Sequence, residues 1–293
     1  MTPVTSPLPQ NIAIIGPGLL GGSLLMALRR LLPGASLRAW ARRDQAVDAL
    51  AKLDLANVCS TDLEAVVNEA ELVILCTPVE TMEALGQAMS GLPLADNAVV
   101  TDVGSVKGSV VTAMEQALEG SSVQFVGSHP MAGSEKAGLE AARADLFEGQ
   151  VCIMTPTLFT TDHALGMVTS LWQRLGCRVM QMSPEEHDRK VARISHMPHL
   201  AAAVVALAAL KDDPHAAACA GNGFRDTTRV SSGDADLWTG IVKQNQAEVV
   251  AALKDARDRF SELVALLENM DEIGLRRFLL EAKTLRDAVP STV

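Results

Sequence analysis

One histidine stands in a segment whose residue types suit acid–base chemistry. His129 lies in SHPMAGSEKAG, residues 128–138, a Gly- and Pro-punctuated stretch after a region of alternating predicted strands and helices. Because an unperturbed imidazole titrates near neutral pH, His129 could take the hydroxyl proton of an alcohol that loses hydride to a nicotinamide. Glu135 follows on the same predicted loop and could orient a substrate or the imidazole. The alternative is a structural histidine in a loop.

A glycine-rich turn near the start of the chain is typical of a dinucleotide-binding fingerprint. The spacing Gly16-x-Gly18-x-x-Gly21 falls between a short apolar strand and a helical pattern, and this context gives the motif its meaning. The glycines permit a tight turn, close approach of backbone amides to a pyrophosphate, and close helix–strand packing. A Gly-rich turn without a ligand is the alternative. We expect the cofactor to contact Gly16, Gly18, Leu19, Leu20 and Gly21.

The end of the second predicted strand bears on the choice between NAD and NADP. An NAD enzyme usually places an acidic residue there to bind the ribose 2′-hydroxyl, whereas this chain has Arg42 and Arg43 after Ala41. A guanidinium group suits a 2′-phosphate. We therefore favour NADP. In the alternative, NAD is the cofactor, the two arginines form a solvated turn, and Asp44 binds the ribose.

Two further strand ends belong to the expected ligand edge. Thr77, Pro78 and Val79 follow one buried strand, and their backbone would line the nicotinamide ribose. Ser105 follows the next strand in the turn DVGSVK and would donate to the reacting groups. The alternative for Ser105 is a role only as a helix cap.

The second half of the chain contributes histidines, arginines and a tryptophan. His196 and His199 flank a Met-Pro pair, and because neither a carboxylate nor a cysteine stands at matching spacing we predict no metal site. For either histidine, His196 above all, the alternative to a functional role is a capped, buried polar contact. Arg225 and Arg229 lie on a Gly-opened segment and are candidates for binding a substrate carboxylate, although Arg225 could instead form a salt bridge with a neighbour. Trp238 is either a core residue or a substrate contact.

Apolar periodicity places these residues in two domains. Strands at 11–15, 36–41, 71–76, 98–102 and 123–127 alternate with helices at 23–32, 45–53, 79–89 and 107–118, which predicts a doubly wound parallel sheet. After about residue 181 the pattern becomes helical, with runs at 191–210, 236–267 and 272–288, and Ser183-Pro184 has helix-start chemistry. We expect a Rossmann-type dinucleotide-binding domain over 1–182, its core starting near residue 11, and an all-α substrate and dimerisation domain over 183–293.

Composition narrows the range of partners. Lys and Arg number 25 against 35 Asp and Glu, a formal net charge of −10, which opposes binding to nucleic acid or an anionic membrane. The five cysteines are scattered without a CxxC motif, which indicates reduced thiols and a cytoplasmic protein. We find no signal-peptide core and expect no membrane span, because the apolar run 201–210 is too short. The apolar helices predict a contact with a second subunit, and a monomeric bundle is the alternative.

Six motifs in order make this chain resemble the prephenate/arogenate dehydrogenase family of tyrosine biosynthesis. The resemblance implies His129 as the catalytic histidine, Ser105 as its partner in the active site, and His199 close to the substrate. It also implies that Arg229 binds the substrate carboxylate, that Trp238 reaches the neighbouring subunit's site, and that the helical half forms a homodimer. The motifs are GPGLLGGS, CTPVE, DVGSVK, GSHPMAGSEKAG, EEHDRKVARISHMPHLAAA and GNGFRDTTRVSSGDADLW.

The reaction that the resemblance implies is an oxidative decarboxylation. Hydride leaves the carbinol carbon of a cyclohexadienol dicarboxylate, prephenate or arogenate, for NAD(P), and loss of CO₂ aromatises the ring. Two rival functions remain. A two-domain dehydrogenase of the β-hydroxyacid type would typically use a lysine in the helical domain, where this chain offers histidine and arginine. A non-catalytic nucleotide-sensing protein would have no use for His129 beside Ser105 and Arg229.

Overall fold

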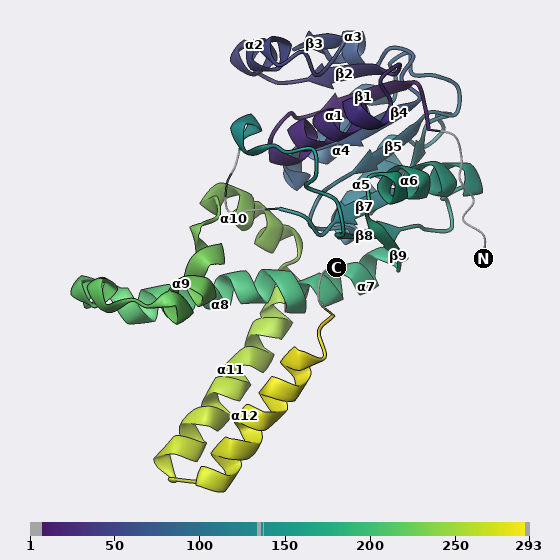
Figure 1. The fold of residues 1–293 in the computed structure, drawn as a ribbon. Helices are drawn as coiled ribbons and strands as arrows, with labels where there is room; N and C mark the ends of the chain where they lie inside the picture. Colours follow the sequence, from purple (N-terminus) through teal and green to yellow (C-terminus); the bar gives the residue numbers. More distant parts are fainter. Residues whose placement is uncertain (1–7, 134–135, 137, 291–293) are drawn as a thin grey trace.

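The computed structural model describes residues 8–133, 136 and 138–290. Its first half is built around a six-stranded sheet in the order β3-β2-β1-β4-β5-β6 (Figure 1). All pairings in this sheet are parallel. Strand order reverses between β1 and β4, so the carboxyl ends of these two strands flank the crevice where such folds bind dinucleotides. The strands are β1 Asn11–Ile15, β2 Ser36–Trp40, β3 Val58–Ser60, β4 Leu72–Leu75, β5 Val99–Asp102 and β6 Gln124–Phe125.

Helices cover both faces of this sheet because its strands carry apolar side chains on both faces. In β1, Ile12 and Ile14 enter one buried cluster with α1 and α6, whereas Ala13 and Ile15 enter a second cluster with α4 and α5. This alternation is the two-residue period of a strand buried on both sides. The helices are α1 Leu19–Leu31, α2 Asp44–Lys52, α3 Leu63–Val67, α4 Met82–Met89, α5 Gly108–Ala117 and α6 Asp162–Arg174.

Helix α1 begins at Leu19, four residues before the start predicted from apolar spacing. Gly18 has an extended backbone and is the N-cap, and the amide of Gly22 already bonds to the Gly18 carbonyl at 2.8 Å. Gly21 and Gly22 therefore belong to the first helical turn, where apolar periodicity gives no signal.

A second sheet, missed by the sequence analysis, follows the first. It contains β7 Gly127–Pro130, β8 Val151–Thr155 and β9 Arg178–Gln181, with β7 antiparallel to β8 and β8 parallel to β9. The strand predicted at 123–127 is confirmed as β6, but it is shorter than predicted: it ends before Val126, and a second strand, β7, begins at Gly127. His129 lies inside β7 and not on the predicted loop.

The helical half opens as predicted at Ser183, whose hydroxyl accepts the Glu186 amide at 3.1 Å. Helix α7 Pro184–Val191 continues through a π-helical turn, η3 Ala192–His196, into α8 Met197–Leu210. The π-turn has a physical cause in Pro198, which lacks an amide proton and crowds the carbonyl four residues earlier, so that the helix widens there without ending.

The continuous helix Pro184–Leu210 differs from the expectation that no apolar run reaches membrane-spanning length. Among the described residues it is the one helix that could cross a membrane by length and composition, with a mean hydropathy of 1.3 in its best window. Its buried polar side chains, His187, Asp188 and His196, hydrogen-bond within the protein. We therefore interpret it as the helix that joins the two domains.

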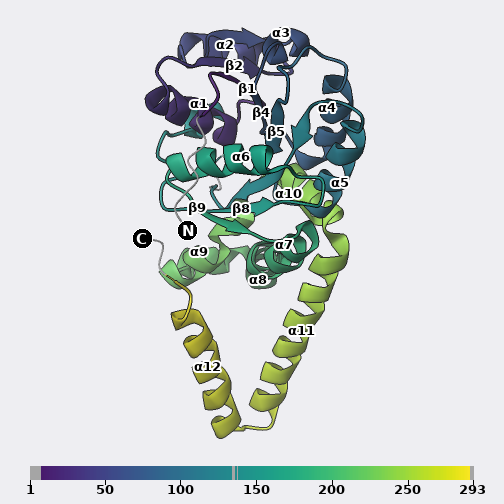
Figure 2. The same cartoon turned by 90° about the vertical axis from the view of Figure 1, so that its right-hand side faces the viewer.

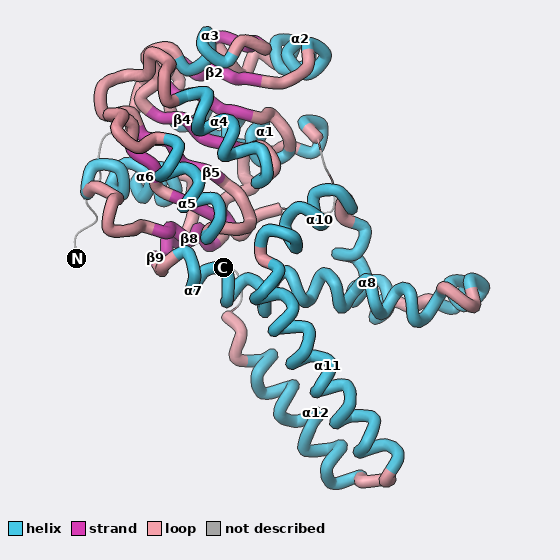
Figure 3. Tube along the Cα trace, turned by 180° about the vertical axis from the view of Figure 1, so that it is seen from behind, coloured by secondary structure: helices cyan, strands magenta, loops and turns pink. Residues whose placement is uncertain are grey.

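The remaining helices are α9, which contacts α8, then α10, and then α11 and α12, which form a helical hairpin. The predicted run 236–267 is interrupted at Asn245, which separates α10 Ala235–Gln244 from α11 Gln246–Glu268. Helices α11 and α12 Glu272–Asp287 project away from the sheets, and α9 Asn222–Thr228 lies against the distal part of α8 (Figure 2 and Figure 3). Short turns η4 Pro214–Cys219 and η5 Arg229–Ser232 flank α9. The elements thus form a Rossmann-type domain followed by a helical domain, as predicted.

Candidate active site

The glycine-rich turn is shaped for close approach of a ligand. Gly16 has φ +97°, and a Cβ on it would come within 2.8 Å of Thr77 Cγ2. A Cβ on Gly21 would sit 2.2 Å from the Gly16 carbonyl oxygen, whereas a Cβ on Gly18 would have no described atom within 4 Å. Gly16 and Gly21 are thus required by packing, and Gly18 leaves open space at the N-terminus of α1. This cradle fits a pyrophosphate bound by backbone amides.

The end of β2 lies beside this cradle. The Gly16 amide donates to the Trp40 carbonyl at 3.0 Å, which holds the glycine turn against the end of β2. Arg42, Arg43 and Asp44 follow and are all exposed. Because all three are accessible, both readings of this turn, NADP through the arginines and NAD through Asp44, fit the geometry.

The ends of β4 and β5 meet at the same edge. Thr81 Oγ donates to the Pro78 carbonyl at 2.7 Å and lies 2.9 Å from Thr77 Oγ. A Cβ on Gly104 would come within 2.8 Å of Val79 Cγ1. The turn after β4 is therefore packed against the turn after β5, which places the segment Thr77–Val79 between the glycine cradle and Ser105.

The turn after β5 is held by a buried ion pair. The Asp102 carboxylate accepts the Gly104 amide at 2.8 Å and the Ser128 amide at 3.2 Å, and it pairs with the ammonium of Lys107. Both side chains of the pair are fully buried. Removing one partner of such a pair typically costs about 3–5 kcal/mol, because the other charge is left uncompensated. Ser105 is half-buried on this rigid turn.

Ser105 does not cap helix α5, so that alternative is wrong. The carboxylate of Asp188, on α7, accepts the amides of Lys107 and Gly108 at 2.8 Å each and thus caps the helix from the other domain. The side chain of Ser105 is consequently available for a role at the site. The hydrogen bonds of the Asp188 carboxylate therefore join helix α7 of the helical domain to helix α5 of the nucleotide-binding domain.

His129 is the buried centre of this edge. Its side chain is 6% exposed, and its Nδ1 lies 2.8 Å from Nε2 of His187. The other nitrogen of His187, Nδ1, lies 2.8 Å from Asp188 Oδ1. Burial lowers the pKa of His129 well below its ordinary value, and the nearby ammonium of Lys107 lowers that pKa further. The imidazole of His129 is therefore a neutral base at physiological pH.

A second group of aromatic side chains comes from the helical domain. Trp238 stacks on His199 with ring centroids 3.5 Å apart and an interplanar angle of 16°. His196 is fully buried, and its Nδ1 lies 3.3 Å from Nδ2 of Asn245, which donates to the Asp188 carbonyl at 2.9 Å. Burial lowers the pKa of His196 to about 4. Through Asn245 this group connects to the His187–Asp188 pair, which agrees with a buried polar contact for His196.

The predicted arginines lie at the outer side of this group. Arg229 opens η5, which packs on α8, and a Cβ on Gly233 at the end of η5 would touch Trp238 and His199. Arg229 and Arg225 are both exposed in the single chain. Glu135 falls outside the described residues.

Five residues of this site were assigned no role by the sequence analysis. His187 and Asp188 lie in the motif EEHD at the start of a helix. Only the fold brings them to His129, because His187 follows His129 by 58 residues in the sequence. Asp102 and Lys107 are the first and last residues of the motif DVGSVK. An acid and a lysine in one buried segment were the signal that could have indicated their ion pair. The set is Asp102, Lys107, His187, Asp188 and Asn245.

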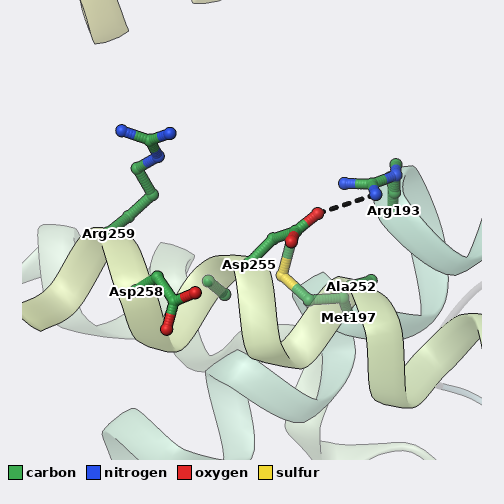
Figure 4. Close-up of a pocket in the computed structure, with 7 residues that line it drawn as sticks. Arg193, Met197, Ala252, Asp255, Asp258 and Arg259 are labelled. Carbon is green, nitrogen blue, oxygen red and sulfur yellow. Dashed lines mark ion pairs between the residues drawn. The ribbon is translucent and has the colours of Figure 1, made fainter.

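A pocket elsewhere in the helical domain does not belong to this site. It has a volume of about 470 Å³ and lies between η3, α8 and α11 (Figure 4). An ion pair of 2.7 Å joins Arg193 and Asp255 across it. The other two charged lining residues, Asp258 and Arg259, have opposite charges, so the lining has no net charge to favour an anion. Among the described residues no cluster of histidine, cysteine and acidic side chains could hold a metal ion.

Comparison with known proteins identifies the family. A family model described as "Prephenate dehydrogenase, nucleotide-binding domain" matches residues 26–181, and one described as "Prephenate dehydrogenase, dimerization domain" matches residues 183–281. The prephenate dehydrogenase of Bacillus subtilis is 32% identical over 96% of this chain and 76% of its own length. The cyclohexadienyl dehydrogenase of Zymomonas mobilis is 32% identical over 96% of both chains.

Solved structures agree with this assignment. Prephenate dehydrogenase from Aquifex aeolicus, in complex with hydroxyphenyl propionate and NAD+, superimposes with a TM-score of 0.87 at 31% identity and covers 97% of this chain and 100% of that chain. Synechocystis arogenate dehydrogenase gives 0.79 at 31% identity, with 94% and 98% covered. A 3-hydroxyisobutyrate dehydrogenase from Mycobacterium tuberculosis, of the rival class, gives only 0.57 at 14% identity, which is likeness of fold alone. The chain belongs to the prephenate/arogenate dehydrogenase family of NAD(P)-dependent dehydrogenases.

Proposed function

We propose that this protein catalyses the NAD(P)-dependent oxidative decarboxylation of a cyclohexadienol dicarboxylate, prephenate or arogenate, in tyrosine biosynthesis. The observation that carries the proposal is the surroundings of His129: a buried, neutral imidazole next to the end of β5, where the amide of the preceding Ser128 donates to Asp102. The test is cofactor reduction by the purified protein with prephenate, arogenate and a 3-hydroxy acid. Reduction with only the 3-hydroxy acid would favour the β-hydroxyacid class, and no reduction with any would favour a nucleotide sensor.

In this mechanism the protein supplies orientation and a proton acceptor. A nicotinamide dinucleotide, which the turn Gly16–Gly21 would hold, would supply the hydride acceptor. As the hydride leaves the carbinol carbon, the O–H bond of the substrate breaks and the imidazole of His129 takes the proton. Loss of the ring carboxylate as CO₂ makes the ring aromatic, and the imidazolium returns the proton to the phenolate oxygen. We assign to Ser105, on the turn after β5 that Asp102 holds, the role of orienting the hydroxyl group or the imidazole.

The substrate carboxylate requires a local cation, because the protein as a whole carries −10 and repels an anion. We assign this role to Arg229, whose turn η5 packs against the helix that carries His199. His199 and Trp238 form a stacked wall next to it. Glu135 would orient the substrate from the segment that follows β7. The substrate then lies between the two domains.

We also propose that NADP is preferred and that Arg42 and Arg43 set the preference. Replacing both by alanine should raise the Kd for NADP about 10- to 100-fold, since hydrogen bonds to charged groups contribute about 1.5–3 kcal/mol. The Kd for NAD should change less than about twofold, because NAD lacks the 2′-phosphate that these groups contact. Quenching of tryptophan fluorescence by each cofactor measures both constants.

Asp44→Asn is the matched control for this cofactor prediction. It leaves both arginines in place and removes only the carboxylate that the NAD reading requires. A large loss of NAD affinity in this variant, or equal affinity of the unmodified protein for both cofactors, would contradict the NADP assignment.

The protein forms a dimer in this proposal through its helical domain, whose apolar faces are uncovered in the single chain. Leu207 on α8 and Leu280 on α12 are 60% and 53% exposed, and Ile273 is 85% exposed. Exposed apolar area of this extent marks an interface. The described cysteines are all free, in keeping with the reducing cytoplasm that we propose as its compartment.

A charged residue in each apolar face should separate the subunits. We expect the double variant Leu207→Glu and Leu280→Glu to be monomeric in light-scattering chromatography, because two buried carboxylates per subunit carry a large desolvation cost. Leu158→Glu, at a fully exposed leucine between β8 and α6, is the control and should stay dimeric. An intact dimer in the double variant would place the interface elsewhere.

A further inference from the structure

We propose that His187 and Asp188 are positioning residues that fix the tautomer of His129, with its proton on Nδ1, so that Nε2 is left as the acceptor for the substrate hydroxyl. This inference rests on the proposed function for the identity of the substrate. It assigns a role to two residues that belong to neither the cofactor cradle nor the substrate wall.

The assignment starts at Asp188, which can act only as an acceptor. Its two carboxylate oxygens accept the amides of Lys107 and Gly108 at 2.8 Å each, and these amides have no choice but to donate. The same carboxylate lies 2.8 Å from Nδ1 of His187. Since an ionised carboxylate carries no proton, His187 must carry its own proton on Nδ1 and donate it to Asp188.

The next step passes from His187 to His129. Burial lowers the pKa of His187, so that the ring is neutral and has one proton, already placed on Nδ1. Its Nε2 is therefore a bare lone pair, and it lies 2.8 Å from Nδ1 of His129. At this distance one nitrogen must donate, because two facing lone pairs would leave both buried acceptors unsatisfied. His129 must therefore carry its proton on Nδ1.

The catalytic nitrogen follows by elimination. The pKa of His129 is also lowered by burial, so this ring too is neutral and its single proton is used toward His187. Nε2 of His129 is left with a lone pair. The charged and titratable groups around the ring, besides the His187–Asp188 pair, are Lys107 and Asp102 from the turn after β5, His196 from η3 and Cys152 from β8.

The hydrogen bonds from His129 through His187 to Asp188, which we call the relay, also explain how a buried histidine can accept a proton. When Nε2 takes the hydroxyl proton, the new imidazolium keeps donating from Nδ1 to His187, and the Asp188 carboxylate stands at the far end of the chain. Asp188 belongs to α7 of the helical domain and caps α5 of the nucleotide-binding domain. The tautomer of His129 is thus set only when the two domains are docked at this edge.

The tautomer itself can be measured without turnover. In the full-length protein labelled with ¹⁵N-histidine, the His129 signals are identified by their loss in His129→Asn. We expect a protonated Nδ1 and an unprotonated Nε2 at neutral pH. In His187→Phe, which keeps a ring but removes the acceptor, the Nε2–H form should become populated. An Nε2–H tautomer or an imidazolium in the unmodified protein would overturn the inference.

Kinetics with matched variants gives a second, independent test. His187→Phe should lower kcat about 100-fold with KM within about threefold, as expected when a base is held in the wrong tautomer. It should also move the acid limb of the kcat profile to lower pH, because the imidazolium loses its acceptor. His187→Gln, whose side-chain oxygen can occupy the position of Nε2, should recover most of the loss.

The two hypotheses fail in different ways. If the unmodified protein is inactive with prephenate and arogenate but shows the expected tautomer, the proposed substrate is wrong and the relay stands. If it is active but His187→Phe and His187→Gln have equal kcat values and unchanged acid limbs, the relay is wrong and the function stands. Thermal unfolding of both variants identifies a loss of activity that is due to misfolding, in which case the labelled unmodified protein decides alone.

Discussion

Replacement of His129 by asparagine is expected to lower kcat by roughly 10²–10⁴-fold, the usual contribution of a general base. Asparagine has a similar size and can still hydrogen-bond to a hydroxyl group, but it cannot take up a proton at neutral pH. Substrate binding should therefore survive, with KM within a few fold of the unmodified enzyme. Steady-state cofactor reduction with the active cyclohexadienol measures both constants.

The pH dependence of the unmodified enzyme gives a second readout of His129. Its pKa is lowered by burial, so the ring stays unprotonated and active below the ordinary titration range of histidine. Activity should be constant near neutral pH and fall only as the pH drops through the lowered pKa. In His129→Asn this acid limb should disappear from the residual rate.

The control for His129→Asn is the same change at an exposed histidine. His163 lies on the outer surface of α6, and His163→Asn should leave kcat, KM and the thermal midpoint unchanged. Near-normal turnover by a folded His129→Asn protein would remove His129 from the mechanism and leave Ser105 as the remaining candidate at this edge.

The features that the sequence predicted well are those carried by local pattern. Gly16 and Gly21 could be recognised because their packing demands repeat in every strand–turn–helix unit that binds a dinucleotide, and the apolar runs of β1, β4 and β5 are those of strands buried on both faces. The start of the helical half was visible because Ser183 is a local cap. The break at Asn245 could not be predicted from the sequence, because the residues before it, in α10, and after it, in α11, both have a helical pattern.

The features that the sequence could not predict depend on contacts between distant segments. His129 was placed on a loop because Gly, Pro and polar residues surround it, yet pairing with β8 makes its segment a strand. The role of Asp188 depends on helix α5, whose N-terminus it caps from 80 residues away. A local pattern shows that EEHD starts a helix, but only the docked domains show that this helix start faces the imidazole of His129.

Replacement of Arg229 by alanine is expected to raise the KM for the substrate about 10- to 100-fold, because a charge-assisted hydrogen bond to a carboxylate contributes about 1.5–3 kcal/mol. The Kd for the cofactor should stay within about twofold, since the nucleotide-binding domain is untouched. Cofactor titration and steady-state kinetics on the same preparation separate the two effects. The prediction tests whether the substrate lies between the domains, against η5 and the stacked pair His199–Trp238.

Arg225→Ala is the matched control for Arg229→Ala, because Arg225 lies on the neighbouring helix α9, is equally a guanidinium and is also exposed. The general attraction of an arginine for an anion would be lost in both variants, whereas a specific bond to the substrate would be lost in one. A large rise of KM in Arg229→Ala alone therefore locates the carboxylate at η5. A parallel loss of cofactor affinity, or a lowered thermal midpoint, would make Arg229 a structural residue and move the substrate carboxylate to another cation.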